Sequence, residues 1–179
     1  VRSGGEGQST IIGVVAVQVT NAPIAKEHIV SFHRCLGTVA RERRYLSFVE
    51  APPLEDTRKF VEANIAQGHI QLVALADGEV VGWCDILPRR MPMFSHCGEL
   101  GIGVLPGFRG RGIGKRLATE ALRRAQEKGF ERVELGVFAS NVVAQALYER
   151  LGFVVEGVKR RARKLDGEYD DVMLMALFL

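Results

Sequence analysis

Residues 99–115 hold the glycines and cations that a phosphate-binding turn needs. The segment reads Glu-Leu-Gly-Ile-Gly-Val-Leu-Pro-Gly-Phe-Arg-Gly-Arg-Gly-Ile-Gly-Lys, so a predicted strand enters a glycine-rich turn and the turn opens a helix. Free N–H groups and the macrodipole make a helix N-terminus positive, and glycines let a phosphate approach that backbone closely. Four cations lie in or next to the turn: Arg109, Arg111, Lys115 and Arg116. We therefore expect the turn to bind a pyrophosphate.

Two widespread phosphate motifs fail at this turn, which narrows the choice of ligand. The nucleoside triphosphate motif GxxxxGK[ST] fails because Arg109 stands in place of its first glycine and Arg116 in place of its serine or threonine. The dinucleotide fingerprint GxGxxG fails because Lys115 or Leu117, depending on the register, replaces its last glycine. The pattern that does fit is [Gln/Arg]-x-x-Gly-x-[Gly/Ala], filled by Arg109, Gly112 and Gly114.

On that pattern the chain resembles the GNAT superfamily of N-acetyltransferases. The turn alone is equally compatible with a capped turn before an amphipathic helix. However, residues 141–153 (Asn-x-x-Ala-x-x-Leu-Tyr-x-x-Leu-Gly-Phe) are similar to the second signature of the family, and Glu156-Gly157 and residues 169–175 resemble its C-terminal end. The resemblance implies an acyltransferase that takes acetyl-coenzyme A as co-substrate. It would pass the acetyl group to a primary amine by direct attack in a ternary complex.

The resemblance also implies roles for single residues. In this family the pantetheine arm bonds to backbone where the fourth and fifth strands splay apart, and the Val104 N–H is the implied donor to the thioester carbonyl. Tyr148 matches the tyrosine that protonates the departing thiolate, with a core tyrosine on an apolar helix face as the alternative. Asn141 is expected to cap a helix first and then to touch the pantetheine arm. The implied cofactor-binding residues are Ile102, Val104, Arg109, Gly110, Arg111, Gly112, Ile113, Gly114, Lys115 and Asn141.

Strand alternation divides residues 99–104 between two faces. The apolar side chains form the core face: Leu100, Ile102 and Val104. On the other face, Gly101 and Gly103 are expected to leave room for a thioester and an amine, with relief of crowding or a bulge as the alternative. Glu99 shares that face and is our candidate for deprotonating the amine through water, with a surface or salt-bridged carboxylate as the alternative. His96 is expected on the face opposite Glu99.

Hydrophobic patterning predicts a mixed α/β sandwich around one sheet. Strands are expected at residues 11–19, 70–76, 79–87, 99–104, 132–138, 153–159 and 171–178, and helices at residues 25–43, 54–67, 112–128 and 142–151. One apolar face is expected on the third helix, made of Ile113, Leu117, Ala118, Ala121, Leu122 and Ala125. Asp77-Gly78 and Asp166-Gly167 predict two-residue hairpin turns. With the resemblance, this order implies a GNAT-like, mostly antiparallel sheet of about seven strands flanked by about four helices. Residues 1–10 are expected to be a flexible lead-in, and residues 11–179 a single acetyltransferase domain.

Composition limits the class of protein. The 179 residues are 47% hydrophobic and 25% charged with a net charge of +3, which indicates an ordinary globular domain and is too mild for a nucleic-acid binder. Three widely spaced cysteines, and four histidines without an HExxH pattern, predict no metal site. The apolar run at residues 11–19 is too short to span a bilayer, so we expect a cytoplasmic protein without a membrane partner. A homodimer is left open.

The resemblance places the amine acceptor between the first two helices and the last hairpin. The first segment, residues 32–53, carries Arg41, Arg43, Arg44, Tyr45 and Phe48. The second, residues 158–169, carries Lys159, Arg160, Arg161, Arg163 and Lys164. This basic run is either a solvated face or a site for a carboxylate-bearing acceptor or the nucleotide end of the cofactor. Two non-enzymatic alternatives remain, a basic interaction module and a protein that binds acyl-coenzyme A without transferring the acyl group.

Overall fold

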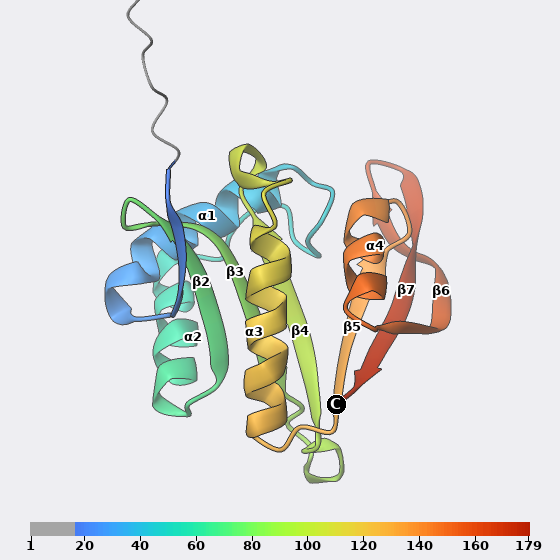
Figure 1. The fold of residues 1–179 in the computed structure, drawn as a ribbon. Helices are drawn as coiled ribbons and strands as arrows, with labels where there is room; N and C mark the ends of the chain where they lie inside the picture. The colour runs from blue at the N-terminus through green and yellow to red at the C-terminus, as the bar shows by residue number, and fades with distance from the viewer. Residues whose placement is uncertain (1–16) are drawn as a thin grey trace, which may run out of the picture.

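A computed structural model describes residues 17–179 and confirms the predicted order of elements (Figure 1). The strands are β1 Val19–Pro23, β2 Ile70–Ala76, β3 Glu79–Pro88, β4 Cys97–Val104, β5 Arg132–Phe138, β6 Val154–Leu165 and β7 Glu168–Phe178. The helices are α1 Ile29–Arg41, α2 Leu54–Ala66, α3 Ile113–Glu127 and α4 Val142–Arg150, with short 3-10 turns η1 Lys26–His28, η2 Pro92–Phe94 and η3 Pro106–Phe108. None of the helices described for residues 17–179 has the length and apolarity needed to cross a bilayer.

All seven strands form one sheet in the order β1-β2-β3-β4-β5-β7-β6. Neighbouring strands are antiparallel except for β4 and β5, which run parallel because α3 connects them across one face of the sheet. The expectation of a mixed, mostly antiparallel sheet with flanking helices is therefore confirmed. The predicted two-residue turns join β2 to β3 and β6 to β7.

The helices cover the two faces of the sheet separately. α1 and α2 pack with Val73, Val80 and Trp83 in one apolar cluster, while α3 and α4 share a second and larger cluster on the other face. The predicted apolar face of α3 is confirmed, since all of its members are buried: Ile113, Leu117, Ala118, Ala121, Leu122 and Ala125. The half of the sheet made by β5, β7 and β6 lies beyond α3 and carries α4 (Figure 1).

Two boundaries near the start of the described chain differ from the prediction. The first described strand lies at Val19–Pro23, where the backbone pairs with β2 from Ala76 to Leu72, so it contains only Val19 of the described part (residues 17–19) of the predicted strand at residues 11–19. The earlier part of that predicted strand, like the predicted lead-in at residues 1–10, lies outside residues 17–179. The predicted helix at 25–43 begins as a 3-10 turn and ends at Arg41, because the backbone of Arg43 turns left-handed with φ of 57°.

The last hairpin is longer than predicted at its closed end. Strands β6 and β7 extend to a turn at residues 166–167, whereas the predicted strands stopped at residue 159 and began again at residue 171. The missing residues are mostly charged, so they lack the apolar alternation by which strands are recognised. A register shift between Lys159 and Arg163 bends this part of the hairpin.

Candidate functional site

The turn that leads into α3 has the backbone geometry of an anion cradle. Gly110 and Gly112 have φ of 74° and 73°, a left-handed conformation that glycine adopts without strain. The first helical hydrogen bond runs from the Arg116 N–H to the Gly112 oxygen at 3.0 Å, so the N–H groups of residues 113–115 precede the helical ladder. The predicted strand, glycine turn and helix are therefore all present. Left-handed glycines next to a helix N-terminus turn successive N–H groups toward one point.

The cations of the turn differ in what they contact. Arg111 stacks over the Phe108 ring at 5.3 Å, and Arg116 donates from Nη1 to the Arg111 carbonyl oxygen at 3.1 Å. Both side chains are exposed, as is Lys115. These three predicted cations therefore stand around the turn with their charge available to an anion.

Arg109 is turned toward α1 instead. Its Nη1 and Nη2 donate to the two carboxylate oxygens of Glu42 at 2.7 and 2.5 Å, and its guanidinium lies 4.7 Å from the centre of the Tyr45 ring. Its Nε donates to the Val104 carbonyl oxygen at 2.8 Å. The charge of Arg109 is thus paired within the protein, and the side chain holds the end of β4 against the end of α1.

Strands β4 and β5 pair only where they begin. Their parallel register covers three residue pairs, the last of which is Glu99 with Glu134, and β5 pairs with no later residue of β4. Figure 1 shows the two strands side by side at that end and apart at the end where α3 starts. The expected splay of the fourth and fifth strands is therefore confirmed. It leaves one edge of β4 without a neighbouring strand.

Backbone alternation decides which residues of β4 face that gap. The Gly103 carbonyl oxygen points toward β3, since it would lie 3.0 Å from a Cβ built on Gly82. Successive residues of a strand direct their polar groups to opposite edges, so the N–H and C=O of Ile102 and Val104 face away from β3. The bond from Arg109 to the Val104 oxygen agrees with this direction. Ile102 and Val104 thus present backbone groups where the resemblance expects a pantetheine arm.

Two predicted site residues belong to α4 and its start, Asn141 at the N-cap and Tyr148 within the helix. Asn141 caps the helix as expected, since its Oδ1 accepts from the Ala144 N–H at 3.2 Å. Tyr148 is 7% exposed and packs at 5.8 Å from the Phe153 ring. Burial raises the pKa of the Tyr148 hydroxyl, and the nearby Cys84 thiol raises it further, so the phenol keeps its proton at neutral pH.

The N-terminus of α3, strand β4 and helix α4 meet around Gly114. A Cβ at Gly114 would lie 3.6 Å from Leu147 Cδ2 and 3.7 Å from Ile102 Cδ1, which is ordinary van der Waals contact. Leu147 immediately precedes Tyr148 on α4. The fold therefore brings the turn, the splayed strand and the Tyr148 helix to one place, although they are separated in the sequence.

The face of β4 that carries Gly101 and Gly103 is filled, which corrects the prediction of open volume there. A Cβ at Gly103 would overlap the six-membered ring of Trp83, and one at Gly101 would lie 2.9 Å from Asp85 Oδ1. Trp83 and Asp85 lie directly opposite these glycines on β3. The glycines relieve crowding, which was the stated alternative, because each side chain of β3 leans over a residue that has none.

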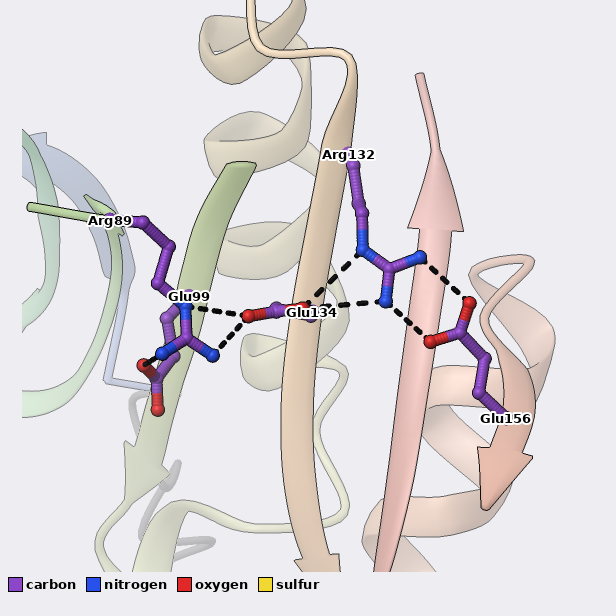
Figure 2. Close-up of polar contacts among 5 residues, drawn as sticks. All are labelled: Arg89, Glu99, Arg132, Glu134 and Glu156. Atoms are coloured by element: carbon purple, nitrogen blue, oxygen red, sulfur yellow. Dashed lines mark hydrogen bonds and ion pairs between the residues drawn. The ribbon is translucent and has the colours of Figure 1, made fainter. Parts of the chain in front are cut away.

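Glu99 lies at the edge of an ion-pair network that Figure 2 shows crossing the sheet. Its Oε2 is 3.8 Å from Arg89 Nη1, and its side chain is 60% exposed. Arg89 also binds Glu134, Arg132 binds Glu134 at 3.3 Å, and Arg132 binds Glu156 through both nitrogens of its guanidinium tip. Glu99 therefore has a partner, but a distant one, and its carboxylate remains open to solvent.

His96 lies outside the strand to which the prediction assigned it. β4 begins at Cys97, and His96 occupies the exposed turn before it, where its carbonyl oxygen accepts from the Glu131 N–H at 3.0 Å. Strand alternation therefore does not fix the direction of the His96 side chain, and the expected opposition to Glu99 does not follow.

The two segments predicted to surround the acceptor touch each other. Arg43, from the connection between α1 and α2, donates to both carboxylate oxygens of Asp166 at 2.7 Å. Arg163 donates to the Arg43 carbonyl oxygen and stacks over Phe138 at 4.6 Å. Residues more than 100 positions apart thus join the α1–α2 connection to the turn of the last hairpin.

Asp85 is a candidate residue that sequence reasoning missed. It is half-buried in β3, and burial together with the Glu99 carboxylate raises its pKa to about 7. One sequence signal pointed to it, because it is the single charged residue of the run Val-Val-Gly-Trp-Cys-Asp-Ile-Leu at residues 80–87. Glu42, the partner of Arg109, was also missed, and its place in the helix gave no signal.

Comparison with known proteins identifies the family. The sequence profile of the Acetyltransferase (GNAT) family matches residues 38–153. The chain belongs to this family. The matched range contains the glycine turn, the splayed strands and α4, whereas the β6–β7 hairpin with its basic run lies beyond it.

Individual GNAT relatives agree with this assignment. The L-amino acid N-acetyltransferase AaaT of Escherichia coli K12 is 36% identical over 107 residues, which are 59% of this chain and 66% of that protein. The chain spans 66%, 32% and 52% of the length of three curated relatives. A GNAT acetyltransferase structure from Streptococcus pneumoniae is 25% identical with a TM-score of 0.84, over 90% of this chain and all of that one.

A further solved structure shares the GNAT fold and was determined with its cofactor. It is a phosphinothricin acetyltransferase from Sinorhizobium meliloti in complex with AcCoA, 21% identical with a TM-score of 0.85 over 90% of this chain and 88% of that chain. The architecture of this GNAT chain is therefore one that appears in cofactor-bound form elsewhere.

The contact between Gly103 and Trp83 yields a stability prediction for this GNAT domain. Gly103→Ala should lower the free energy of unfolding by about 1–3 kcal/mol, because the new methyl group overlaps the buried indole. Urea unfolding of the variant measures this. Gly107→Ala is the matched control, since a Cβ there meets nothing within 4 Å. In a Trp83→Leu background the cost of Gly103→Ala should shrink, and an unchanged cost would show that the two residues are not coupled.

Proposed function

We propose that this chain is an N-acetyltransferase that transfers the acetyl group of acetyl-coenzyme A to a primary amine. The observation that carries the proposal is the junction at Gly114, where an anion cradle, an unpaired strand edge and the helix that carries the protonated Tyr148 meet. Membership of the GNAT family and the cofactor-bound structure of similar fold support it. A protein that only binds acyl-coenzyme A would need the cradle and the strand edge but not the tyrosine, and a basic interaction module would need none of the three.

The cofactor would lie along the gap between β4 and β5. Its pyrophosphate would accept from backbone N–H groups of residues 110–115, with Arg111, Lys115 and Arg116 as counter-charges. Its pantetheine arm would bond to the free edge of β4 at Ile102 and Val104. The Asn141 side-chain amide would reach the arm from the N-terminus of α4. Arg109 would act through the backbone it fixes, since its own charge is paired with Glu42.

The chemistry would take place where the gap meets α4. A neutral amine attacks the thioester carbonyl, whose oxygen is held by the Val104 N–H. The carbon–sulfur bond then breaks, and the departing thiolate takes the Tyr148 proton. Burial keeps this phenol protonated but also makes it a weak acid, so it gives up its proton as the second nitrogen proton replaces it. Glu99 would help to remove a proton from the amine through water, from its exposed position at the edge of the network drawn in Figure 2.

We further propose that the acceptor amine carries a carboxylate. The similar AaaT protein is an L-amino acid N-acetyltransferase. In this chain Arg161 and Lys164 lie 4.7 and 4.9 Å from the centre of the Tyr169 ring, so that two cations gather around one aromatic side chain of the last hairpin. A carboxylate beside these two cations would gain charge-assisted contacts.

The cradle predicts a charge-specific loss of cofactor binding at Gly112. Acetyl-coenzyme A at 100 times its Kd should stabilise the protein by about 2.7 kcal/mol, which corresponds to a rise in Tm of roughly 5–10 °C. Gly112→Asp should remove most of that rise, because it places a negative charge beside the phosphates. Gly112→Asn introduces a side chain of nearly the same shape as Asp but without the charge, and Asn tolerates the positive φ of this position. This variant should keep most of the rise in Tm. Equal shifts for the two variants would contradict a phosphate site at this turn.

The position of Tyr148 predicts a loss of turnover without a loss of binding. Tyr148→Phe removes only the hydroxyl, so the ring contact with Phe153 persists. We expect turnover to fall roughly 10–10³-fold, as for a positioned acid, while the acetyl-coenzyme A thermal shift stays the same. Free thiol release is the measurement. Full turnover across the pH range would assign Tyr148 to the core alone.

The acceptor class is tested by paired substrates. An L-amino acid and its carboxamide differ in the carboxylate and retain the same reacting amine, so we expect kcat/KM to favour the acid by roughly 10-fold or more. Replacing Arg161 and Lys164 together by Gln should remove that preference and leave turnover of the carboxamide unchanged. A preference that survives the double replacement would move the carboxylate site elsewhere. Release of no thiol with any amine would favour a protein that only binds acyl-coenzyme A.

A further inference from the structure

Asp85 is a carboxylate in a place where carboxylates are rare. It lies in the middle of β3, whose residues 80–84 and 86 are buried. Two effects raise the pKa of its carboxyl group: burial and repulsion by the Glu99 carboxylate. Within residues 17–179, neither a hydrogen bond nor a nearby cation offsets them. An uncompensated carboxylate of this kind destabilises a fold, so its presence calls for another explanation.

The strand beside Asp85 leaves room for its carboxyl group. Asp85 is paired with Gly101 of β4, and its Oδ1 lies 2.9 Å from the position that a Cβ of residue 101 would take. Any larger residue at 101 would displace the carboxyl group. Gly101 is also the second residue after Glu99, at which the pairing of β4 with β5 stops. The Asp85 carboxyl group therefore lies over the backbone of β4 where the cofactor gap opens.

Asp85 and Glu99 form a pair of carboxylates on one face of the sheet. Glu99 is opposite Leu87, two residues along β3 from Asp85, so the two acidic side chains are diagonal neighbours. Glu99 is exposed and faces Arg89, whereas Asp85 is half-buried and has no cation. The inner member of the pair is thus the one whose proton affinity the protein raises.

We propose that Asp85 takes the proton from the acceptor amine, and that Glu99 acts as the outer carboxylate between Asp85 and solvent. The inference rests on the proposed N-acetyltransferase function and names a proton acceptor within that site. In this scheme Glu99 no longer takes the amine proton through water, because Asp85 takes it and Glu99 lies between Asp85 and solvent.

The proton balance is complete with groups already named. The acceptor arrives as an ammonium ion and gives one proton to the Asp85 carboxylate, which leaves a neutral nitrogen. That nitrogen forms a bond to the thioester carbon, and the carbon–sulfur bond breaks. The sulfur takes the Tyr148 proton, and the second nitrogen proton replaces it. Asp85 then releases its proton to solvent past Glu99. One ammonium and one thioester become one amide, one thiol and one released proton.

Other charged groups near this face are paired. Arg89 is held between Glu99 and Glu134, and Arg132 between Glu134 and Glu156. On the helical side, Glu42 at the end of α1 is neutralised by Arg109. Cys84 precedes Asp85 on β3 but points into the opposite core, and burial raises the pKa of its thiol so that it stays neutral. Glu99 is therefore the group whose charge Asp85 senses.

The first experiment measures Asp85 without any turnover. A carboxyl group with a pKa near 7 in the folded protein, against 3.8 when unfolded, destabilises the fold as pH rises between those values. Asp85→Asn removes this effect. Its Tm should match wild type near pH 4 and exceed it by roughly 5–10 °C above pH 7. Asp77→Asn, at the exposed β2–β3 turn, is the matched control and should show no such divergence.

The second experiment compares pH–rate profiles for one acceptor amine. In wild type, kcat/KM should rise with pH along a limb centred near 7. Asp85→Asn should lose this limb and fall roughly 10²–10⁴-fold, while Asp77→Asn keeps it. Glu99→Gln should keep the limb but move it to lower pH, because removal of a negative charge lowers the pKa of Asp85.

The opposite results would overturn the inference. If Glu99→Gln loses the limb or moves it to higher pH, and Asp85→Asn retains it, then Glu99 itself takes the proton. If Asp85→Asn gains no Tm above pH 7, Asp85 is not a carboxyl group of raised proton affinity. A wild-type protein that acetylates no amine would overturn the proposed function and this inference together. An active wild type with an unaltered Asp85→Asn profile would overturn this inference alone.

Discussion

The candidate site depends on one break in a hydrogen-bonded ladder. Within residues 17–179, β4 and β5 are the only parallel neighbours of the sheet, and they pair over three residues before they separate. Had the pairing continued, the N–H and C=O of Ile102 and the N–H of Val104 would be satisfied by β5 and would bind nothing else, whereas the Val104 oxygen is held by Arg109. Buried backbone N–H and C=O groups need hydrogen-bond partners. Where the ladder is interrupted inside a sheet, these groups can bind a ligand that carries amide groups of its own. The pantetheine arm of acetyl-coenzyme A is such a ligand.

Other contacts keep the separated strands in place. Arg109 joins the last carbonyl of β4 to Glu42 at the end of α1, so the free edge of β4 is anchored on its helical side. At the closed end, the network from Arg89 to Glu156 connects the strands on both sides of the break. Across the open end, Arg43 and Asp166 join the α1–α2 connection to the last hairpin. The gap is thus bordered by polar contacts between elements that are distant in sequence.

The glycines of this site have different physical purposes. Gly110 and Gly112 adopt left-handed backbone conformations, which places N–H groups in the cradle. Gly101 and Gly103 lie in an ordinary strand and make room for Asp85 and Trp83 of β3. A single residue type therefore shapes a loop in one case and admits a neighbour in the other. The second use places an unpaired carboxyl group beside the backbone that the cofactor would occupy.

The sequence alone determined the features that depend on local periodicity and turn chemistry. The apolar face of α3, the Asn141 cap, the two-residue turns and the glycine cradle were all predicted, because each is decided by residues within one or two turns of chain. Only the tertiary structure decided what crosses between elements. Arg109 reads as a free cation until Glu42, 67 residues away, pairs with it. Gly101 and Gly103 suggest open space until β3 places Asp85 and Trp83 over them. These outcomes depend on strand register and helix packing. Both are set by many weak contacts between distant segments, so they cannot be predicted from any single short segment.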